Sequence, residues 1–156
     1  QEEALAISDK VIVMNNAVIA QEGSPKDLYN LPKNKFVANF IGDANVVKAE
    51  IINKKSDIYE LKLGEMSVNV KSERDLNGFV SVALRPEKIN ISKEKTSNSI
   101  LAKVNNASFV GSNYQYIFNS SLGKLYVVSG DTNNVYKVNE EVCVTIDAEE
   151  IKILED

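Results

Sequence analysis

The sequence contains no histidine and no tryptophan, and it has a single cysteine among its 156 residues. Without histidine, the chain offers neither a histidine metal ligand nor a histidine general base. One cysteine cannot form a disulfide within the chain, which is typical of proteins in a reducing compartment such as the cytoplasm. Cys143 stands between two valines in an alternating pattern, so we interpret it as a packing residue rather than a nucleophile.

Long hydrophobic runs and an excess of positive charge are missing as well. No apolar run approaches the roughly 20 residues that span a bilayer, so we expect no direct insertion into a membrane. The net charge is −4, whereas a nucleic-acid surface needs a basic stripe that neutralises phosphates. We therefore expect no nucleic-acid partner.

The clearest strand pattern lies between Phe79 and Ile91. Apolar residues at positions 80, 82 and 84 alternate with Ser81, Ala83 and Arg85, which predicts a half-buried strand, and Pro86 then ends it. The same alternation, break and Glu-x-Ile-x-Ile ending return 62 positions later, from residue 141 to residue 153. We interpret this return as an internal duplication.

Residues 1–45 predict a short α/β segment. The pattern indicates the end of a helix over residues 2–8, a hairpin of two strands over residues 11–21, and two short helices that begin after Ser24 and Asn34. The wholly apolar run from Val11 to Met14 is typical of a strand that is covered on both faces.

From Val46 onward the pattern is β throughout. Short alternating segments with frequent turn residues predict a mainly β region over residues 46–156, built as two small, closely packed barrels. We expect the repeats to cover about residues 46–93 and 100–156, with the polar segment 94–99 between them.

Several stretches carry a resemblance to a known family. They are Gln1–Leu5, Ser8–Asn15, Gly23–Tyr29, Phe36–Gly42 and Leu84–Glu87. In these stretches the sequence resembles the C-terminal part of the ATP-binding subunit of an ABC importer, in the ferric-iron and polyamine branch. The resemblance implies that residues 1–45 end the ATPase domain and that residues 46–156 form a TOBE-type regulatory domain, which is a duplicated OB-like β-barrel. Ala17 stands where the family has glycine, which puts the geometry of that hairpin turn in question.

The same resemblance implies a function for the whole subunit. The full-length protein would be a transport ATPase that binds ATP and magnesium, works as a homodimer with permease subunits, and lies on the cytoplasmic face of the membrane. The phosphate-binding loop, the signature motif and the magnesium-positioning acids are absent from this sequence. We therefore expect no catalytic, cofactor-binding or metal-binding residue in it, and no ATPase activity of its own.

Five residues are candidates for regulation or dimer contact. Arg85 and Glu87 flank the proline at the strand end, and they form either such a contact or a solvated turn. Tyr114, Tyr116 and Phe118 alternate along one strand, as in a stacking platform for single-stranded nucleic acid. No cluster of arginine and lysine accompanies them, so we favour packing in the core or against a second subunit.

Two alternative functions remain open. The loop Gly111-Ser112-Asn113 offers free N–H groups to an anion, as expected of a small oxyanion-binding domain of the molybdate type. An OB-fold nucleic-acid binder is the other alternative, and the acidic balance disfavours it. The carboxylates from Asp147 to Glu150 are able to hold a cation, but such clusters at strand ends are usually solvated turns.

Overall fold

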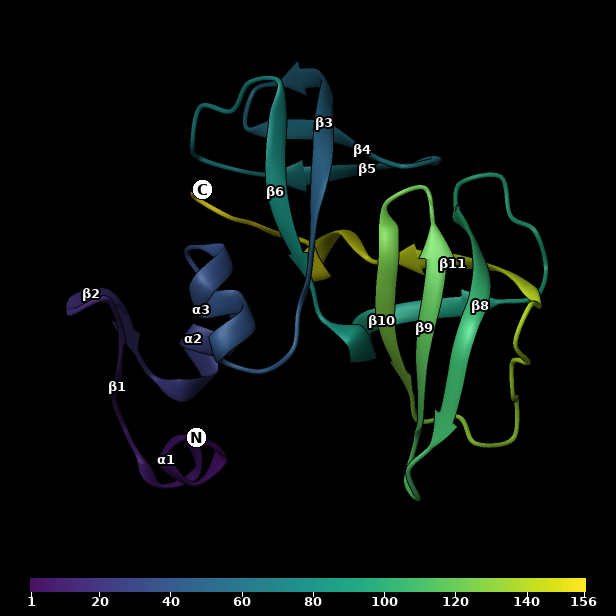
Figure 1. Ribbon diagram of the computed structural model, residues 1–156. Helices are drawn as coiled ribbons and strands as arrows, with labels where there is room; N and C mark the ends of the chain where they lie inside the picture. The colour runs from purple at the N-terminus through teal and green to yellow at the C-terminus, as the bar shows by residue number, and fades with distance from the viewer.

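The computed structural model describes residues 1–156, and Figure 1 shows the N-terminal part lying to one side of two β-sheets. The N-terminal part consists of α1 (Glu2–Ile7), β1 (Val11–Asn15), β2 (Val18–Gly23), α2 (Pro25–Asn30) and α3 (Lys35–Phe40). None of these helices is long and apolar enough to cross a membrane.

The predicted starts of α2 and α3 are confirmed. The Ser24 hydroxyl accepts a hydrogen bond from the backbone N–H of Asp27 at 3.1 Å, and Pro25 follows at the first helical position. The Asn34 side chain accepts from the N–H of Val37 at 3.0 Å. Each cap satisfies an N–H that has no partner inside its own helix.

The β1–β2 hairpin departs from the sequence prediction on one face. Val13 is 2% exposed, but Ile12 and Met14 are 52% and 56% exposed, so β1 is covered on one face only. The covering comes from Leu28 of α2 and Val37 of α3, which pack against Val13. No segment of the chain covers the other face, which is why the prediction of a strand buried on both faces is wrong.

The β region consists of two five-stranded antiparallel sheets, in the orders β12-β6-β3-β4-β5 and β10-β9-β8-β11-β7. Their strands are β3 (Asn45–Lys55), β4 (Ile58–Leu63), β5 (Met66–Lys71), β6 (Phe79–Leu84), β7 (Ile89–Ser92), β8 (Ile100–Phe109), β9 (Tyr114–Ser120), β10 (Gly123–Ser129), β11 (Glu141–Ile146) and β12 (Lys152–Ile153). The predicted fold class, mainly β with a duplicated barrel-like unit, is confirmed.

The two repeats exchange their last strands. β7 follows β6 in the chain but pairs with β11, while β12 follows β11 but pairs with β6. The exchange begins at the 3₁₀ turns η1 (Pro86–Lys88) and η2 (Ala148–Glu150), which lie 62 positions apart and redirect the chain between sheets. Each sheet therefore takes four strands from one repeat and its fifth from the other, and both share one core of 23 buried residues.

Strand β6 is buried on both faces, which corrects the prediction of a half-buried strand. Val82 points into the shared core, whereas Ala83 on the opposite face is 2% exposed and packs against Ala38 of α3 and Leu154 near the C-terminus. Ser81, on this second face, is 7% exposed. The alternation in sequence identified one buried face, and only the docking of α3 and the C-terminal residues buries the other.

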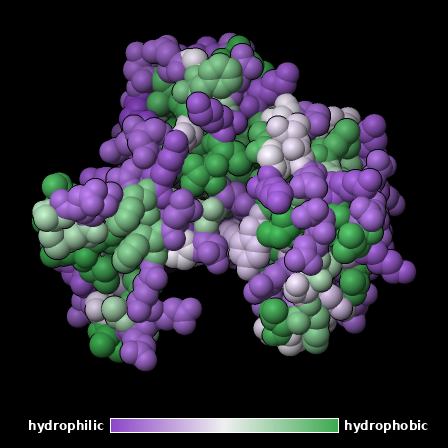
Figure 2. Space-filling model, in the orientation of Figure 1, coloured by the Kyte–Doolittle hydropathy of each residue, from purple (hydrophilic) through white to green (hydrophobic).

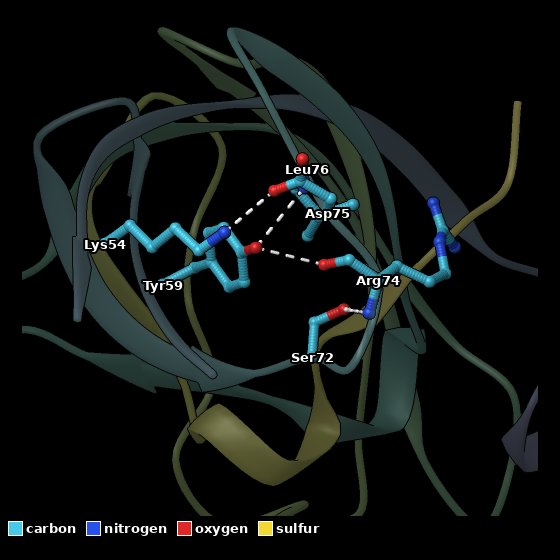
Figure 3. A network of polar contacts seen from close by, with 6 residues as sticks. All are labelled: Lys54, Tyr59, Ser72, Arg74, Asp75 and Leu76. Atoms are coloured by element: carbon cyan, nitrogen blue, oxygen red, sulfur yellow. Dashed lines mark hydrogen bonds and ion pairs between the residues drawn. The ribbon is translucent and has the colours of Figure 1, made fainter. Parts of the chain in front are cut away.

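A buried tyrosine in each repeat holds a loop, the one before β6 in the first repeat and the one before β11 in the second. The Tyr59 hydroxyl donates to the carbonyl of Arg74 at 3.0 Å and accepts from the N–H of Leu76 at 3.3 Å (Figure 3). In the second repeat, the Tyr116 hydroxyl accepts from the N–H of Tyr136 at 3.3 Å. A buried hydroxyl is costly unless it finds such partners, so these bonds fix each loop against its barrel.

Candidate functional site

Arg85 lies where the N-terminal part meets the sheets. It follows β6, and Pro86 ends the strand because it has no N–H to continue the ladder. The side chain is only 5% exposed. The interpretation of Arg85 as part of a solvated turn is therefore wrong, because the residues from Tyr29 to Asp43 enclose it.

The Arg85 guanidinium donates to four backbone carbonyls. Nη1 donates to Ala38 at 2.8 Å, to Asp43 at 2.9 Å and more weakly to Gly42 at 3.3 Å. Nη2 donates to the carbonyl of Tyr29 at 2.7 Å. These carbonyls belong to the ends of α2 and α3 and to the turn after α3, where carbonyls lack partners within a helix and carry partial negative charge. One side chain thus holds the ends of both helices.

The charge of Arg85 is balanced by these dipoles and by an aromatic ring, since no carboxylate forms a salt bridge with it. Its Cζ lies 4.0 Å from the centre of the Tyr29 ring, within the range of a cation–π contact. Burial lowers the pKa of the Arg85 guanidinium from its ordinary value, yet arginine stays protonated in proteins.

Glu87 completes this junction from the exposed side. The Tyr29 hydroxyl donates a hydrogen bond to a Glu87 carboxylate oxygen. Burial, followed by this hydrogen bond, raises the pKa of Tyr29 to about 12, because the phenolate would lose water and face the carboxylate. Arg85 and Glu87 therefore hold opposite sides of the same tyrosine. We call Tyr29, Arg85 and Glu87 the junction triad.

Asn45 connects the junction to the second sheet. Its side chain donates to the carbonyl of Tyr126 and accepts from the N–H of Tyr126, both at 2.7 Å. Tyr126 lies in β10, an edge strand, and burial raises the pKa of its hydroxyl. The N-terminal part, the first sheet and the second sheet are thus joined within a few residues.

The C-terminal residues hold the N-terminal part from another side. The N–H of Glu155 donates to the carbonyl of Lys33 at 2.6 Å, and the N–H of Lys35 donates to a carboxylate oxygen of Asp156 at 2.9 Å. With Arg85 these bonds fix α3 at both of its ends.

The aromatic candidates lie away from the junction triad. Tyr116 and Phe118 are fully buried in the shared core, and Tyr114 is half-buried with its ring 5.1 Å from that of Phe109. Tyr116 and Phe118 have no exposed surface, so a second subunit cannot contact them directly. It can contact only the outward-facing residues nearby.

Sequence reasoning missed Tyr29 and Asn45 as members of this arrangement. Both lay in the stretches already compared with the family, or directly after them. Their partners are 56 and 81 positions away in the chain, so no local pattern pointed to them.

The remaining candidate sites have no such architecture. In the loop before β9, the backbone N–H of Val110 donates a hydrogen bond to the carbonyl of Asn113 at 3.0 Å. Glu150, in the acidic turn η2, forms a salt bridge with Lys88 at 3.3 Å. No group of three or more histidine, cysteine, aspartate or glutamate side chains converges anywhere in the chain.

Comparison with known protein families and curated proteins gives consistent matches. The model of the TOBE domain matches residues 82–154. The "Fe(3+) ions import ATP-binding protein FbpC" of Agrobacterium fabrum is 32% identical over 142 residues, which are 91% of this chain and 40% of that protein.

Two polyamine-system proteins are also similar. The "Spermidine/putrescine import ATP-binding protein PotA" of Acetivibrio thermocellus is 42% identical over 115 residues, covering 74% of this chain and 32% of that protein. The protein of the same name from Ruegeria pomeroyi is 32% identical over 161 residues, covering 100% of this chain and 44% of that protein. The chain spans less than half the length of each of these three relatives.

Among solved structures, the cytoplasmic molybdate-binding protein ModG is similar with a TM-score of 0.57. The match covers 70% of this chain and 94% of that chain at 12% sequence identity. At this identity the likeness concerns the fold alone.

Proposed function

Because residues 82–154 form a TOBE domain and the chain is homologous to ATP-binding subunits of ABC importers, we propose that it is the C-terminal part of such a subunit and serves as its regulatory and dimerisation region. In this proposal residues 1–45 end the ATPase domain and residues 46–156 form the regulatory domain.

The hydrogen bonds of Arg85 are the observation that carries the regulatory role. They tie the end of the proposed ATPase domain, from Tyr29 to Asp43, to the end of β6, an inner strand of the first sheet. A buried, multiply bonded guanidinium forms a stiff connection. A displacement of the β region would therefore be passed on to α2 and α3.

The hairpin supports the assignment of residues 1–45. Four apolar side chains of the hairpin are between 52% and 67% exposed: Ile12, Met14, Val18 and Ile19. Figure 2 shows hydrophobic residues at the surface of this part of the molecule. Contiguous exposed apolar residues of this kind indicate a missing packing partner, and we assign that role to the preceding part of the ATPase domain.

The whole subunit would bind ATP and magnesium and hydrolyse ATP through residues outside this sequence, together with permease subunits on the cytoplasmic face of the membrane. Ferric iron or a polyamine is the proposed transported solute, since the relatives named above belong to those systems. Residues 1–156 would have no ATPase activity of their own.

The test compares two proteins under the same conditions. Phosphate release with magnesium and ATP is measured for the 156-residue chain and for the full-length product of the gene that encodes it. We expect turnover only in the full-length protein. Turnover by the 156-residue chain, or a full-length product without ATPase activity, would overturn the proposal.

We also propose a homodimer that pairs through the β region. Phe109 and Val110 at the β8–β9 end are 58% and 48% exposed, and the Phe109 ring lies 5.1 Å from that of Tyr114 in a tilted arrangement. A symmetric contact would bury the same patch on both subunits and close the assembly. Sedimentation equilibrium of the wild type and of Phe109→Ser decides this: we expect a dimer that the substitution weakens, and a monomeric wild type contradicts it.

Binding of a free oxyanion such as molybdate is the second candidate, favoured by the fold likeness to ModG. Titration calorimetry of the 156-residue chain with molybdate distinguishes the two. Saturable binding would support this candidate, and its absence leaves the regulatory region as the better explanation.

A further inference from the structure

A cleft of about 570 Å³ lies on the outer side of the second sheet, away from the junction triad. Its floor is apolar and includes Leu101, which is 41% exposed, and Cys143, which is 4% exposed. Three lysines line it: Lys93, Lys95 and Lys103. Apolar floors with a few convergent polar groups and volumes of about 300–1,000 Å³ are typical of small-molecule sites.

The strand register explains why these groups meet. Lys103 on β8 stands directly between Glu141 on β11 and Asn119 on β9. Lys93 and Lys95 come from the segment after β7, the strand contributed by the first repeat. The strand exchange between the repeats thus brings lysines of the connecting segment to a sheet made mostly of the second repeat.

Charge in the cleft favours an anion. Among its lining residues the three lysines face a single carboxylate, Glu141. Lys93 lies 3.6 Å from Glu140, whereas Lys95 and Lys103 have no salt-bridge partner. Asn119, Ser120 and Ser121 also line the cleft and bring amide and hydroxyl groups to it.

The first sheet shows what this surface looks like when the chain itself covers it. Ser81 and Cys143 are 62 positions apart, and each pairs with the first strand of its repeat, Ser81 with Lys48 and Cys143 with Leu101. Around Ser81, α3 and the C-terminal residues border a smaller hollow of about 370 Å³. On the second sheet, the segment that carries Lys93 and Lys95 borders the corresponding place, and the larger cleft of about 570 Å³ lies there.

We propose that the cleft lined by Lys93, Lys95 and Lys103 binds an organic phosphate, with the phosphate on the lysines and the apolar part of the molecule on Leu101. Lys95 and Lys103, the two lining lysines without a salt-bridge partner, bring two positive charges to a phosphate monoester that carries roughly −1.5 to −2 at neutral pH. Lysine is a common phosphate ligand that acts as a point charge. The net charge of −4 for the chain disfavours a nucleic-acid polymer.

The rim of the cleft also contacts the first repeat. The Ser121 hydroxyl donates to a carboxylate oxygen of Glu65 at 2.8 Å. Asn98, in the segment that carries Lys93 and Lys95, bonds to both backbone groups of Ser67 at 2.8 Å. A ligand that orders this rim would stabilise the contact between the two repeats. Binding at the cleft needs neither ATP nor the ATPase domain, so it goes beyond the function proposed above.

The experiment is a titration of the isotope-labelled 156-residue chain with phenyl phosphate, followed by amide chemical shifts. We expect saturable shifts centred on residues 93–103 and 119–121. The variant Lys95→Gln with Lys103→Gln should weaken binding about tenfold or more, because both free cations are lost. Lys62→Gln, at an exposed lysine on β4 outside the cleft, is the matched control and should bind as the wild type does.

Two further probes separate the parts of the proposal. Inorganic phosphate should bind more weakly than phenyl phosphate, and phenol should not bind, if both the lysines and the apolar floor contribute. Absence of saturable shifts, shifts centred on another surface, or equal affinity in the double variant and the wild type would overturn the proposal. Equal affinity for inorganic and phenyl phosphate would overturn the role of Leu101.

Discussion

Asn45 and Asn98 occupy equivalent positions just before the two repeats, and each binds an edge strand in the same way. Asn45 lies two residues before Val47, which pairs with Val82, and Asn98 lies two residues before Ile100, which pairs with the equivalent Val144. Each side chain bonds to both backbone groups of one residue in the other repeat, Asn45 to Tyr126 on β10 and Asn98 to Ser67 on β5.

The side-chain amides of Asn45 and Asn98 bond to backbone groups on the outer side of an edge strand, where no further strand pairs. β5 and β10 are edge strands, and exposed edges carry unpaired N–H and carbonyl groups. A side-chain amide presents one donor and one acceptor in the spacing of a backbone partner. Both copies of the duplicated unit thus have an asparagine that joins one repeat to the edge strand of the other.

Asn45→Ala should destabilise the chain more than Asn98→Ala. Asn45 is 8% exposed, so its loss leaves buried backbone groups of Tyr126 without partners, at a cost of about 1–3 kcal/mol. Asn98 is exposed, and water replaces its bonds. Urea denaturation of both variants measures the difference, and equal free energies of unfolding would contradict the role given to burial.

Arg85→Ala should release the N-terminal part from the sheets. Four carbonyls lose their donor, and the expected loss of stability is about 3 kcal/mol or more. Arg85→Lys should recover only part of it, since an ammonium cannot reproduce the planar fork. Limited proteolysis should cleave near residues 29–43 faster in Arg85→Ala than in the wild type.

The control for this prediction is Arg74→Ala. Arg74 is exposed and its Nη2 donates to a single carbonyl, that of Leu154, at 3.0 Å. Similar proteolysis of the two alanine variants would show that Arg85 has no special role at the junction.

The junction triad should make stability depend on alkaline pH. The pKa of Tyr29 is raised to about 12 in the folded chain from an ordinary value of 10.0. The folded state therefore binds this proton more tightly than the unfolded state, so the contribution is fully present below pH 10 and is lost as the pH rises toward 12.

Comparison with Tyr29→Phe isolates that contribution from other alkaline titrations. The wild type should lose more free energy of unfolding than Tyr29→Phe between these two pH values. Near pH 10 the phenolate absorbance of folded wild type should equal that of folded Tyr29→Phe, whereas the unfolded wild type should exceed unfolded Tyr29→Phe by one tyrosine. Parallel stability curves for the two proteins would argue against the raised pKa.

Ala17→Gly should stabilise the β1–β2 hairpin. Asn16 and Ala17 have φ values of 50° and 64°, so both turn residues are left-handed, and this conformation costs an L-residue about 1–2 kcal/mol. Glycine avoids that cost, but it loses more conformational entropy on folding than alanine does, which costs about 0.5–1 kcal/mol. The net gain in stability is a few tenths to about 1 kcal/mol.

Ala20→Gly in strand β2 is the matched control. It has no left-handed residue to relieve and should destabilise the hairpin by roughly 0.5–1 kcal/mol. Thermal melting of both variants checks the signs, and a lower melting temperature for Ala17→Gly would contradict the prediction.

The local elements followed from the sequence because their causes are local. The caps at Ser24 and Asn34 and the alternation in β6 rest on residues a few positions apart, and the repeat of 62 positions is visible in the printed chain. The family resemblance rested on the same short stretches. The mainly β class and the place of the helices were therefore predictable.

Only the tertiary structure decided which strands complete which sheet and what becomes of Arg85. β7 and β12 are too short to specify a partner by pattern alone, and the shared core selects the sheet they join. Arg85 looked like a solvated strand end because the carbonyls that bury it lie more than 40 positions away. Arg85 is buried at the junction by packing between segments that are far apart in the chain, and such packing leaves no periodic pattern in the sequence.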